Sequence, residues 1–315
     1  MAAESNNYAQ IGVINRFGAG AALIDKEMDE LITRKNDIPL QGSRFFRKVT
    51  ADTLVHKEGT VGSGLEQPVI QEDSDDLRHV TPAPGFDVTL TAQTLRSAIR
   101  VTRTLNINQR IKKVNELMSG LMDSARRNLE YAFADVFNNA FAAAVVGADG
   151  VPLCSGSHPN EMIMTGTWDN EETGGALTPA SYSTMRVNMG LRTSETGEVM
   201  PMSPDMLMVS RSNEEKAWQI LESNHIPDST LLGKNWNMGS TGLFVYDYLT
   251  DQNNYFMIDN SDVASKGGLI YFEKEAPQIR ENPEKKADII FDEYLRMTYA
   301  TGFSTSKAIQ GNVGA

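Results

Sequence analysis

The chain has 315 residues, of which 40% are hydrophobic and 22% are charged, a balance typical of a folded protein. Its length exceeds the usual size of one hydrophobic core, so we expect two or more subregions. The formal net charge of -12 argues against a sequence-independent grip on nucleic acid, which needs clustered Lys and Arg against the phosphates.

The first 42 residues begin polar and Gly-punctuated and then contain one short amphipathic pattern. Its apolar residues are Leu23, Ile24, Met28, Leu31 and Ile32. Pro39 marks the latest point at which such a helix could end. The segment is either an ordinary surface helix or an arm that packs on a neighbouring subunit, and its glycines favour the arm.

Residues 43–92 have the pattern of a long hairpin. Arg44–Thr50 and Thr53–His56 are expected to make one strand, and Val80 with Phe86–Thr91 the returning one. The segment between them is rich in Gly and includes the acidic run 72–76. A hairpin with a polar tip and little core is marginal alone, so we expect it to lie across a neighbouring subunit. The alternative is a flexible surface loop with no partner.

A long helix follows after Asn106. Apolar residues recur there at steps of three or four, at Ile107, Ile111, Val114, Met118, Leu121, Ala125, Leu129, Ala132, Val136 and Ala140. A rise of about 1.5 Å per residue makes this helix roughly 50 Å long. An extended ribbon that leads into a long single-sided helix is typical of a subunit that tiles against its neighbours rather than of a compact enzyme.

Positive charge is concentrated where the ribbon meets this helix, at Arg96, Arg100, Arg103, Arg110, Lys112 and Lys113. Three interpretations are open for this cluster. It could contact nucleic acid, although it is small and lacks interleaved aromatic residues. It could contact acidic segments of adjacent subunits, which we favour, or it could be a solvated face.

From about residue 146 the pattern becomes mixed α/β. Thr178 is suited to cap a helix that begins at Pro179 and runs to Leu191. A second helix is expected from Ser212 or Asn213 through Leu221. Short apolar runs predict strands at 206–209, 243–246, 255–258 and 269–272, and further strands between 287 and 303.

In this order of elements the chain resembles the HK97-fold major capsid proteins of tailed bacteriophages. Three stretches carry the resemblance: Phe86–Arg103 (FDVTLTAQTLRSAIRVTR), Leu153–Pro159 (LCSGSHP) and Tyr294–Gln310 (YLRMTYATGFSTSKAIQ). The resemblance implies an α+β fold. Its parts would be an N-terminal arm (1–42), an extended hairpin called the E-loop (43–92), a peripheral domain with a spine helix (93–145), an axial domain (146–280) and a return β segment of the peripheral domain (281–315).

The resemblance also implies a structural function. The chain would form hexamers and pentamers of an icosahedral shell around double-stranded DNA, without sequence-specific DNA binding. Its partners would be a scaffolding protein, a portal and a decoration protein, with assembly in the host cytoplasm and a final place in the virion. Contacts between subunits are expected at Lys57, Asp73, Asp75, Asp76, Arg96, Arg100 and Arg103. Some members of the family join an E-loop lysine covalently to an asparagine, and Lys57 lies in the matching region without an identified partner.

Two alternatives remain: an encapsulin-like bacterial compartment of the same fold, and a hydrolase built on Cys154 and His158. A thiol nucleophile needs a base and a group that orients the base, and no oxyanion hole is evident in the sequence. The single cysteine excludes an intramolecular disulfide and a multi-cysteine zinc site.

The four histidines lack metal-ligand spacing, and the glycine-rich run 59–64 lacks the Lys-Ser/Thr ending of a phosphate loop. We therefore expect no catalytic, cofactor or metal site. We also expect no membrane contact, because neither a signal peptide nor a bilayer-length apolar run is present.

Overall fold

The computed structural model describes residues 40–61, 84–102, 107–160, 166–193, 199–200, 202–227, 233–260, 268–281 and 289–314. These residues form two compact units. Unit 1 includes Thr94–Leu129 and Glu275–Thr298, and unit 2 includes Gln41–Gln93, Glu130–Lys274 and Tyr299–Ala315. The amphipathic pattern expected between residues 23 and 32 lies outside the described residues.

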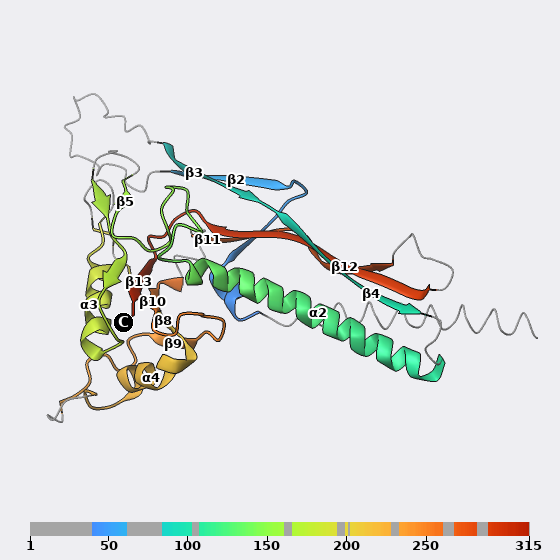
Figure 1. Ribbon diagram of the computed structural model, residues 1–315. Coiled ribbons are helices and arrows are strands. Elements are labelled where there is room, and N and C mark those ends of the chain that lie inside the picture. Colours follow the sequence, from blue (N-terminus) through green and yellow to red (C-terminus); the bar gives the residue numbers. More distant parts are fainter. Residues whose placement is uncertain are drawn as a thin grey trace, which may run out of the picture. The chain divides into compact units, whose positions relative to one another are not determined.

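Most of the long helix α2 (Ile107–Asn138) belongs to unit 1, and Figure 1 shows it as one uninterrupted helix. The predicted helix is therefore confirmed. Within unit 1, Met118, Leu121, Ala125 and Leu129 of the predicted stripe are buried, and Met122 is buried beside them. The remaining turns of α2, from Glu130 onward, belong to unit 2.

Unit 1 also contains three long strands among its described residues. They are β4 (Gln93–Thr102), the end of β11 (Leu269–Glu281) and the first part of β12 (Ile289–Phe303), with β12 between the other two. Arg100 on β4 donates from Nε and Nη2 to Asp292 Oδ2 on β12, at 3.2 and 3.0 Å. Glu275 on β11 forms ion pairs with Arg280 and Arg296.

Unit 2 is built on a five-stranded sheet with the order β7-β13-β10-β8-β9. Its strands are β7 (Glu171–Thr173), β8 (Met206–Val209), β9 (Gly242–Val245), β10 (Tyr255–Ile258) and β13 (Ile309–Val313). The central strand β10 pairs antiparallel with β8 and β13. All four residues of β8 and of β10 are buried, as expected for strands covered on both faces.

Two helices contribute to the core of this sheet. Residues of α3 (Pro179–Gly190) and α4 (Glu214–Glu222) form one apolar cluster with β8 and β10. The expected cap of α3 is present, because the Thr178 side chain accepts from Ser181 N and the Ser181 side chain accepts from Thr178 N. A short 3-10 turn, Arg211–Asn213, precedes α4.

The C-terminal segment is divided between the two units, with the first part of β12 in unit 1 and β13 in unit 2. The expected return β segment of residues 281–315 stays a prediction. The strand β13 lies inside the five-stranded sheet of unit 2, between β7 and β10. This pairing joins residues far apart in the chain, so no local pattern could predict it.

The hairpin is also present, with one correction. β2 (Val55–Val61) and β3 (Pro84–Thr91) pair antiparallel, and Figure 1 shows them side by side. The single strand expected between residues 44 and 56 is wrong. That stretch instead begins with a 3-10 turn (Gly42–Phe45), continues as β1 (Arg47–Thr50) and breaks before β2. β1 pairs in parallel with the start of β11, with Val49 opposite Phe272.

The root of the hairpin packs into the core of its own unit. Val88, Leu90 and Ala92 are buried and cluster with Ile270 and Phe272. The His56 ring stacks on Phe272 at 5.3 Å between ring centroids. On the same strand, Glu58 forms an ion pair with Arg47. We expected the hairpin to have little core of its own. Its root is instead anchored in the core of unit 2.

Candidate functional site

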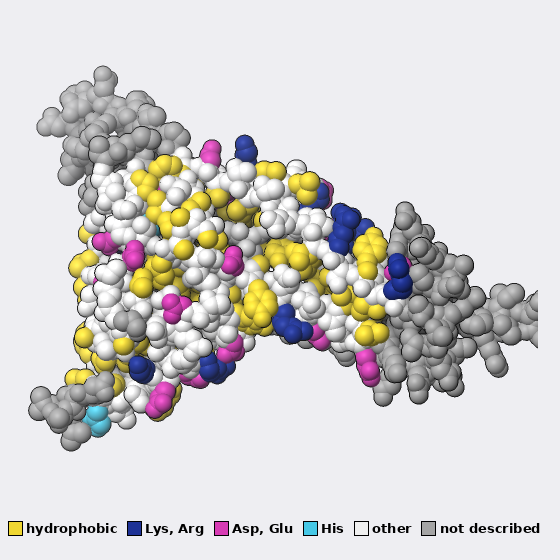
Figure 2. Space-filling view, viewed as in Figure 1, with side chains coloured by type: hydrophobic (Ala, Val, Ile, Leu, Met, Phe, Trp, Pro, Cys, Tyr) yellow, Lys and Arg dark blue, Asp and Glu magenta, His cyan; other side chains and the backbone are white. Residues whose placement is uncertain are grey.

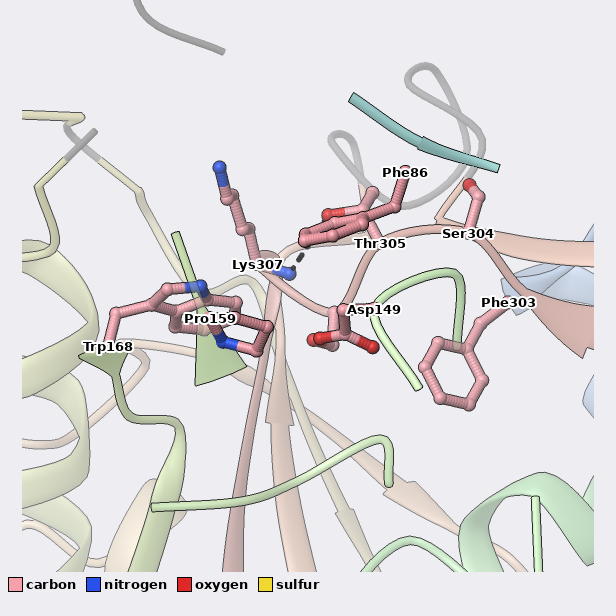
Figure 3. A pocket seen from close by; sticks show the side chains of 9 residues that line it. Phe86, Asp149, Pro159, Trp168, Phe303, Ser304, Thr305 and Lys307 are labelled. Carbon is pink, nitrogen blue, oxygen red and sulfur yellow. Dashed lines mark hydrogen bonds between the residues drawn. The ribbon is translucent and has the colours of Figure 1, made fainter. Parts of the chain in front are cut away.

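A small pocket in unit 2 lies where four segments of the chain meet. Figure 3 shows Asp149 between Trp168 and Pro159 on one side and Phe303 on the other, with Phe86 and Thr305 above. Its lining is Phe86, Asp149, Pro159, Trp168, Phe303, Ser304, Thr305, Ser306 and Lys307. Two of these residues lie on the two-residue strands β5 (His158–Pro159) and β6 (Thr167–Trp168).

Asn170 holds the segments behind this pocket together. Its buried side-chain amide donates to the carbonyl oxygens of Leu153, Ser306 and Ile309, at 2.8, 3.3 and 3.2 Å. Its Oδ1 accepts from Ser155 N at 2.8 Å. The side chain thus connects the 153–155 turn to the segment that leads into β13, and its amide orientation is fixed by these bonds.

His158 completes the same network. It is fully buried, with Nδ1 2.6 Å from Asp149 Oδ2 and Nε2 3.0 Å from Asn170 Oδ1. Its ring stacks on Trp168 with the centroids 4.4 Å apart. Both ring nitrogens are therefore engaged by acceptors, and neither is available as a base for a nearby nucleophile.

Cys154 is not arranged as a nucleophile. Its side chain is buried, and burial raises the pKa of the thiol well above its usual range, so the reactive thiolate is disfavoured. The pairing of His158 with Asp149 and Asn170 removes the only candidate base in the 153–159 turn. In the Cys154–His158 pair considered from the sequence, Cys154 packs in the core and His158 takes part in a buried hydrogen-bond network.

Arg192 secures the segment before β13 from the other side. Its guanidinium donates to the Lys307 carbonyl and to Gln310 Oε1, and it lies 5.3 Å from the centroid of the Trp168 ring. Burial lowers the pKa of Arg192 to about 10. Burying a cation costs desolvation energy, and hydrogen bonds to fixed oxygen acceptors offset that cost. We therefore interpret Arg192 as a residue that stabilises the fold.

Glu130 forms a second buried polar junction. Its carboxylate accepts from Gln41 N, from Gly42 N at 3.1 Å and from the Tyr246 hydroxyl at 3.1 Å. Burial, together with this carboxylate, holds the pKa of Tyr246 above its usual range. Only glycine fits at residue 42, because a Cβ there would lie 2.7 Å from the Tyr246 hydroxyl and 2.8 Å from Phe133 Cβ.

The residues expected at subunit contacts are not gathered into one place. Lys57 is exposed on β2 opposite Thr89, and Arg96 is exposed on β4. Arg100 has an intramolecular partner, Asp292, where a partner on another subunit was expected. Asp73, Asp75, Asp76 and Arg103 lie outside the described residues.

The sequence reading missed both polar junctions. Glu130 bonds to residues at least 88 positions away, and Asn170 bonds both to the 153–158 segment and to residues 136 and 139 positions away, so neither has a local signature. Among the described residues, no group of three or more His, Cys, Asp or Glu side chains is arranged to hold a metal ion. Within the same part of the chain, no helix has both the length and the apolar character needed to span a membrane.

Comparisons with known proteins find similarity to capsid proteins. A family model described as "Phage capsid protein" matches residues 87–310. The fold is similar to that in the capsid of the empty GTA particle, with a TM-score of 0.55 and 10% identity over 88% of this chain and 97% of that one.

Two further solved structures share this fold. The procapsid of bacteriophage JBD30 gives a TM-score of 0.50 and 12% identity over 94% of this chain and 76% of that one. The structure from Mycobacterium phage Adephagia gives a TM-score of 0.51 and 10% identity, over 88% of this chain and 91% of that one. No curated protein matches the sequence.

Proposed function

Because the chain belongs to the phage capsid protein family, we propose that it forms the hexamers and pentamers of an icosahedral shell around double-stranded DNA. The chain is a structural major capsid protein with the HK97 fold, and it assembles into multimeric capsid shells. The observation that carries the proposal is the family match over residues 87–310. This span begins in β3 and ends in β13, so it includes elements of both units.

The hairpin supports a role in joining subunits. Its inner side is occupied by the subunit's own core through Val88 and Leu90, whereas Lys57, Asp87 and Thr89 on the opposite side are exposed. This outer side is free to lie on a neighbouring subunit. We propose Lys57 and Arg96 as residues that contact neighbouring copies, with the acidic residues Asp73, Asp75 and Asp76 as their counterparts.

The charge of the chain suits a container for DNA. A formal net charge of -12 disfavours adhesion of the inner surface to packed phosphates, and weak adhesion eases both filling and ejection. The proposed DNA contact is therefore enclosure without sequence recognition. The further partners that we propose are a scaffolding protein, a portal and a decoration protein, with assembly in the host cytoplasm.

No observation favours the two alternatives. The family match is to phage capsid proteins rather than to a bacterial compartment. A hydrolase at Cys154 lacks an available base, since both ring nitrogens of His158 face other acceptors. We therefore propose that the chain is not an enzyme.

Sedimentation velocity over a wide range of concentrations tests this function. The purified full chain, alone and with a candidate scaffolding protein, should populate capsomers or shells as concentration rises. A single sharp monomer boundary at every concentration, with the scaffolding protein present as well, would contradict the proposal.

A further inference from the structure

The outward side of α3 is unusual for a helix at a protein surface. Tyr182, Met185 and Met189 are buried in the core, yet Val187 and Leu191 on the opposite side are 56% and 67% exposed. The helix has one charged residue, Arg186, and its exposed polar residues are Thr184 and Asn188. Large aliphatic side chains exposed on a surface helix indicate an interaction site where they join a wider apolar patch.

Trp236 extends this apolar surface. Its side chain is 81% exposed, and the guanidinium carbon of Arg186 lies 6.0 Å from its ring centroid. The loop around it is held firmly, because Asn237 Nδ2 donates to Ser183 Oγ at 3.1 Å and Asn235 Nδ2 donates to the Ile220 carbonyl at 2.7 Å. The residues on both sides of Trp236 are therefore anchored to α3 and α4.

Val199 joins the same surface and is 64% exposed. It is tied to the end of α3 by a backbone bridge with Thr193 and by the bond from Met200 N to the Arg192 carbonyl. We call Arg186, Val187, Leu191, Val199 and Trp236 the α3 face. Figure 2 shows hydrophobic side chains along the edge of unit 2 where α3 runs. Apolar groups, Trp and Arg are enriched at the centres of protein interfaces, where other charges are depleted.

The outward side of α4 has a complementary character. Ala217, Ile220 and Leu221 are buried, while Glu215, Trp218 and Glu222 are exposed. Trp218 is 56% exposed and is flanked along the helix by the two carboxylates. We call Glu215, Trp218 and Glu222 the α4 face. It offers an aromatic group for apolar contact and carries negative charge, whereas Arg186 on the α3 face is positive.

We propose that the α3 face of one subunit packs against the α4 face of the next copy of this chain within a capsomer. This inference rests on the proposed shell function and names the surfaces that close its rings. A contact between two different surfaces repeats head to tail around an axis, which is how identical subunits form closed rings. The opposite charges set the direction of the contact, and the two tryptophans and the α3 aliphatic residues contribute most of the buried apolar area.

Cross-linking between engineered cysteines tests this pairing in the full chain. Cys154 is buried and its thiol pKa is raised, so it does not compete for a thiol reagent. Assembled particles of the Leu191→Cys/Glu222→Cys variant, treated with a short bis-maleimide, should give a ladder of covalent species up to the full ring. Each single variant alone should stay monomeric, and an equimolar mixture of the two should stop at dimers.

Charge reversal provides the matched second variant. Arg186→Glu should lower particle yield about tenfold or more, and adding Glu215→Arg and Glu222→Arg in the same chain should restore it. The melting temperature of the dissociated subunit is measured for each variant, so that a folding defect is recognised. The cross-linking variant, which leaves Arg186 intact, decides the matter if Arg186→Glu does not fold.

The outcomes separate this contact from the proposed function. Normal shells without a ladder would overturn the α3–α4 pairing and leave the capsid function standing. Cross-linking of the Leu191→Cys variant with itself would also overturn the pairing, because it requires a symmetric contact between two α3 faces. If the unmodified chain forms no ring or shell under any condition, the proposed function fails and the pairing fails with it.

Discussion

The Asn170 network and the α3 face lie in the same unit, but the first is buried and the second is exposed to solvent. Around Asn170, buried polar groups from three separate segments satisfy one another, and the His158 ring has no exposed surface. On the α3 face, Trp236 and Leu191 are 81% and 67% exposed. The difference separates residues that determine the fold of one subunit from residues that are exposed until a partner covers them.

Removing the Asn170 side chain should therefore have the largest effect on the subunit. Asn170→Ala leaves three carbonyl oxygens, Ser155 N and His158 Nε2 without their partner in a buried site. We expect a loss of about 3–5 kcal/mol in the free energy of unfolding, measured by urea denaturation. The matched control is Asn188→Ala on the exposed side of α3, which should change stability by less than about 0.5 kcal/mol. Equal effects of the two substitutions would refute the contrast.

The Glu130 junction should come next in size. Glu130→Gln keeps the shape but removes the charge that accepts from Gly42 N and from the Tyr246 hydroxyl. The expected cost is about 1.5–3 kcal/mol, by the same denaturation measurement. Glu116→Gln, at an exposed position of the same helix, should be nearly neutral. A neutral Glu130→Gln would mean that the carboxylate is not needed to hold residues 41 and 42.

Gly311 and Cys154 are closely packed, so substitutions at the two positions should each lower the free energy of unfolding by an intermediate amount, and their effects should not be additive. A Cβ at residue 311 would lie 2.6 Å from Cys154 Sγ and 2.9 Å from Phe141. Gly311→Ala should thus cost about 1–3 kcal/mol, and Cys154→Ala alone about 1 kcal/mol. The double variant should be more stable than the sum of the two single losses implies, because the second substitution removes the closest clash. Strict additivity in this double-mutant cycle would contradict the described contact.

The hairpin should give the smallest effect on the subunit and a large one on assembly. Residues 62–83 join β2 to β3, and replacing them with a short Gly/Ser turn keeps the packed root that includes Val88 and Leu90. The melting temperature of the subunit should stay nearly unchanged, while particle yield should fall sharply. Unfolding of the shortened subunit would place this segment in the core, and normal particle yield would exclude it as a clasp between subunits.

Elements with local signals were predictable from the sequence. The stripe of α2 follows a helical period, and the Thr178–Pro179 pair marks the start of α3. The pairing of β1 with β11 and the place of β13 in the five-stranded sheet depend on contacts across the whole chain. The same holds for the candidate site, because a lone Asn170 or Glu130 has no sequence pattern that reveals its distant partners.

As a major capsid protein, this chain should build closed shells from many copies of itself. Negative-stain electron microscopy of the full chain, expressed alone and together with a candidate scaffolding protein, examines this assembly. We expect closed, rounded shells of uniform diameter with ring-shaped capsomers on their surface. Finding only separate monomers or irregular aggregates in well-folded preparations would contradict it.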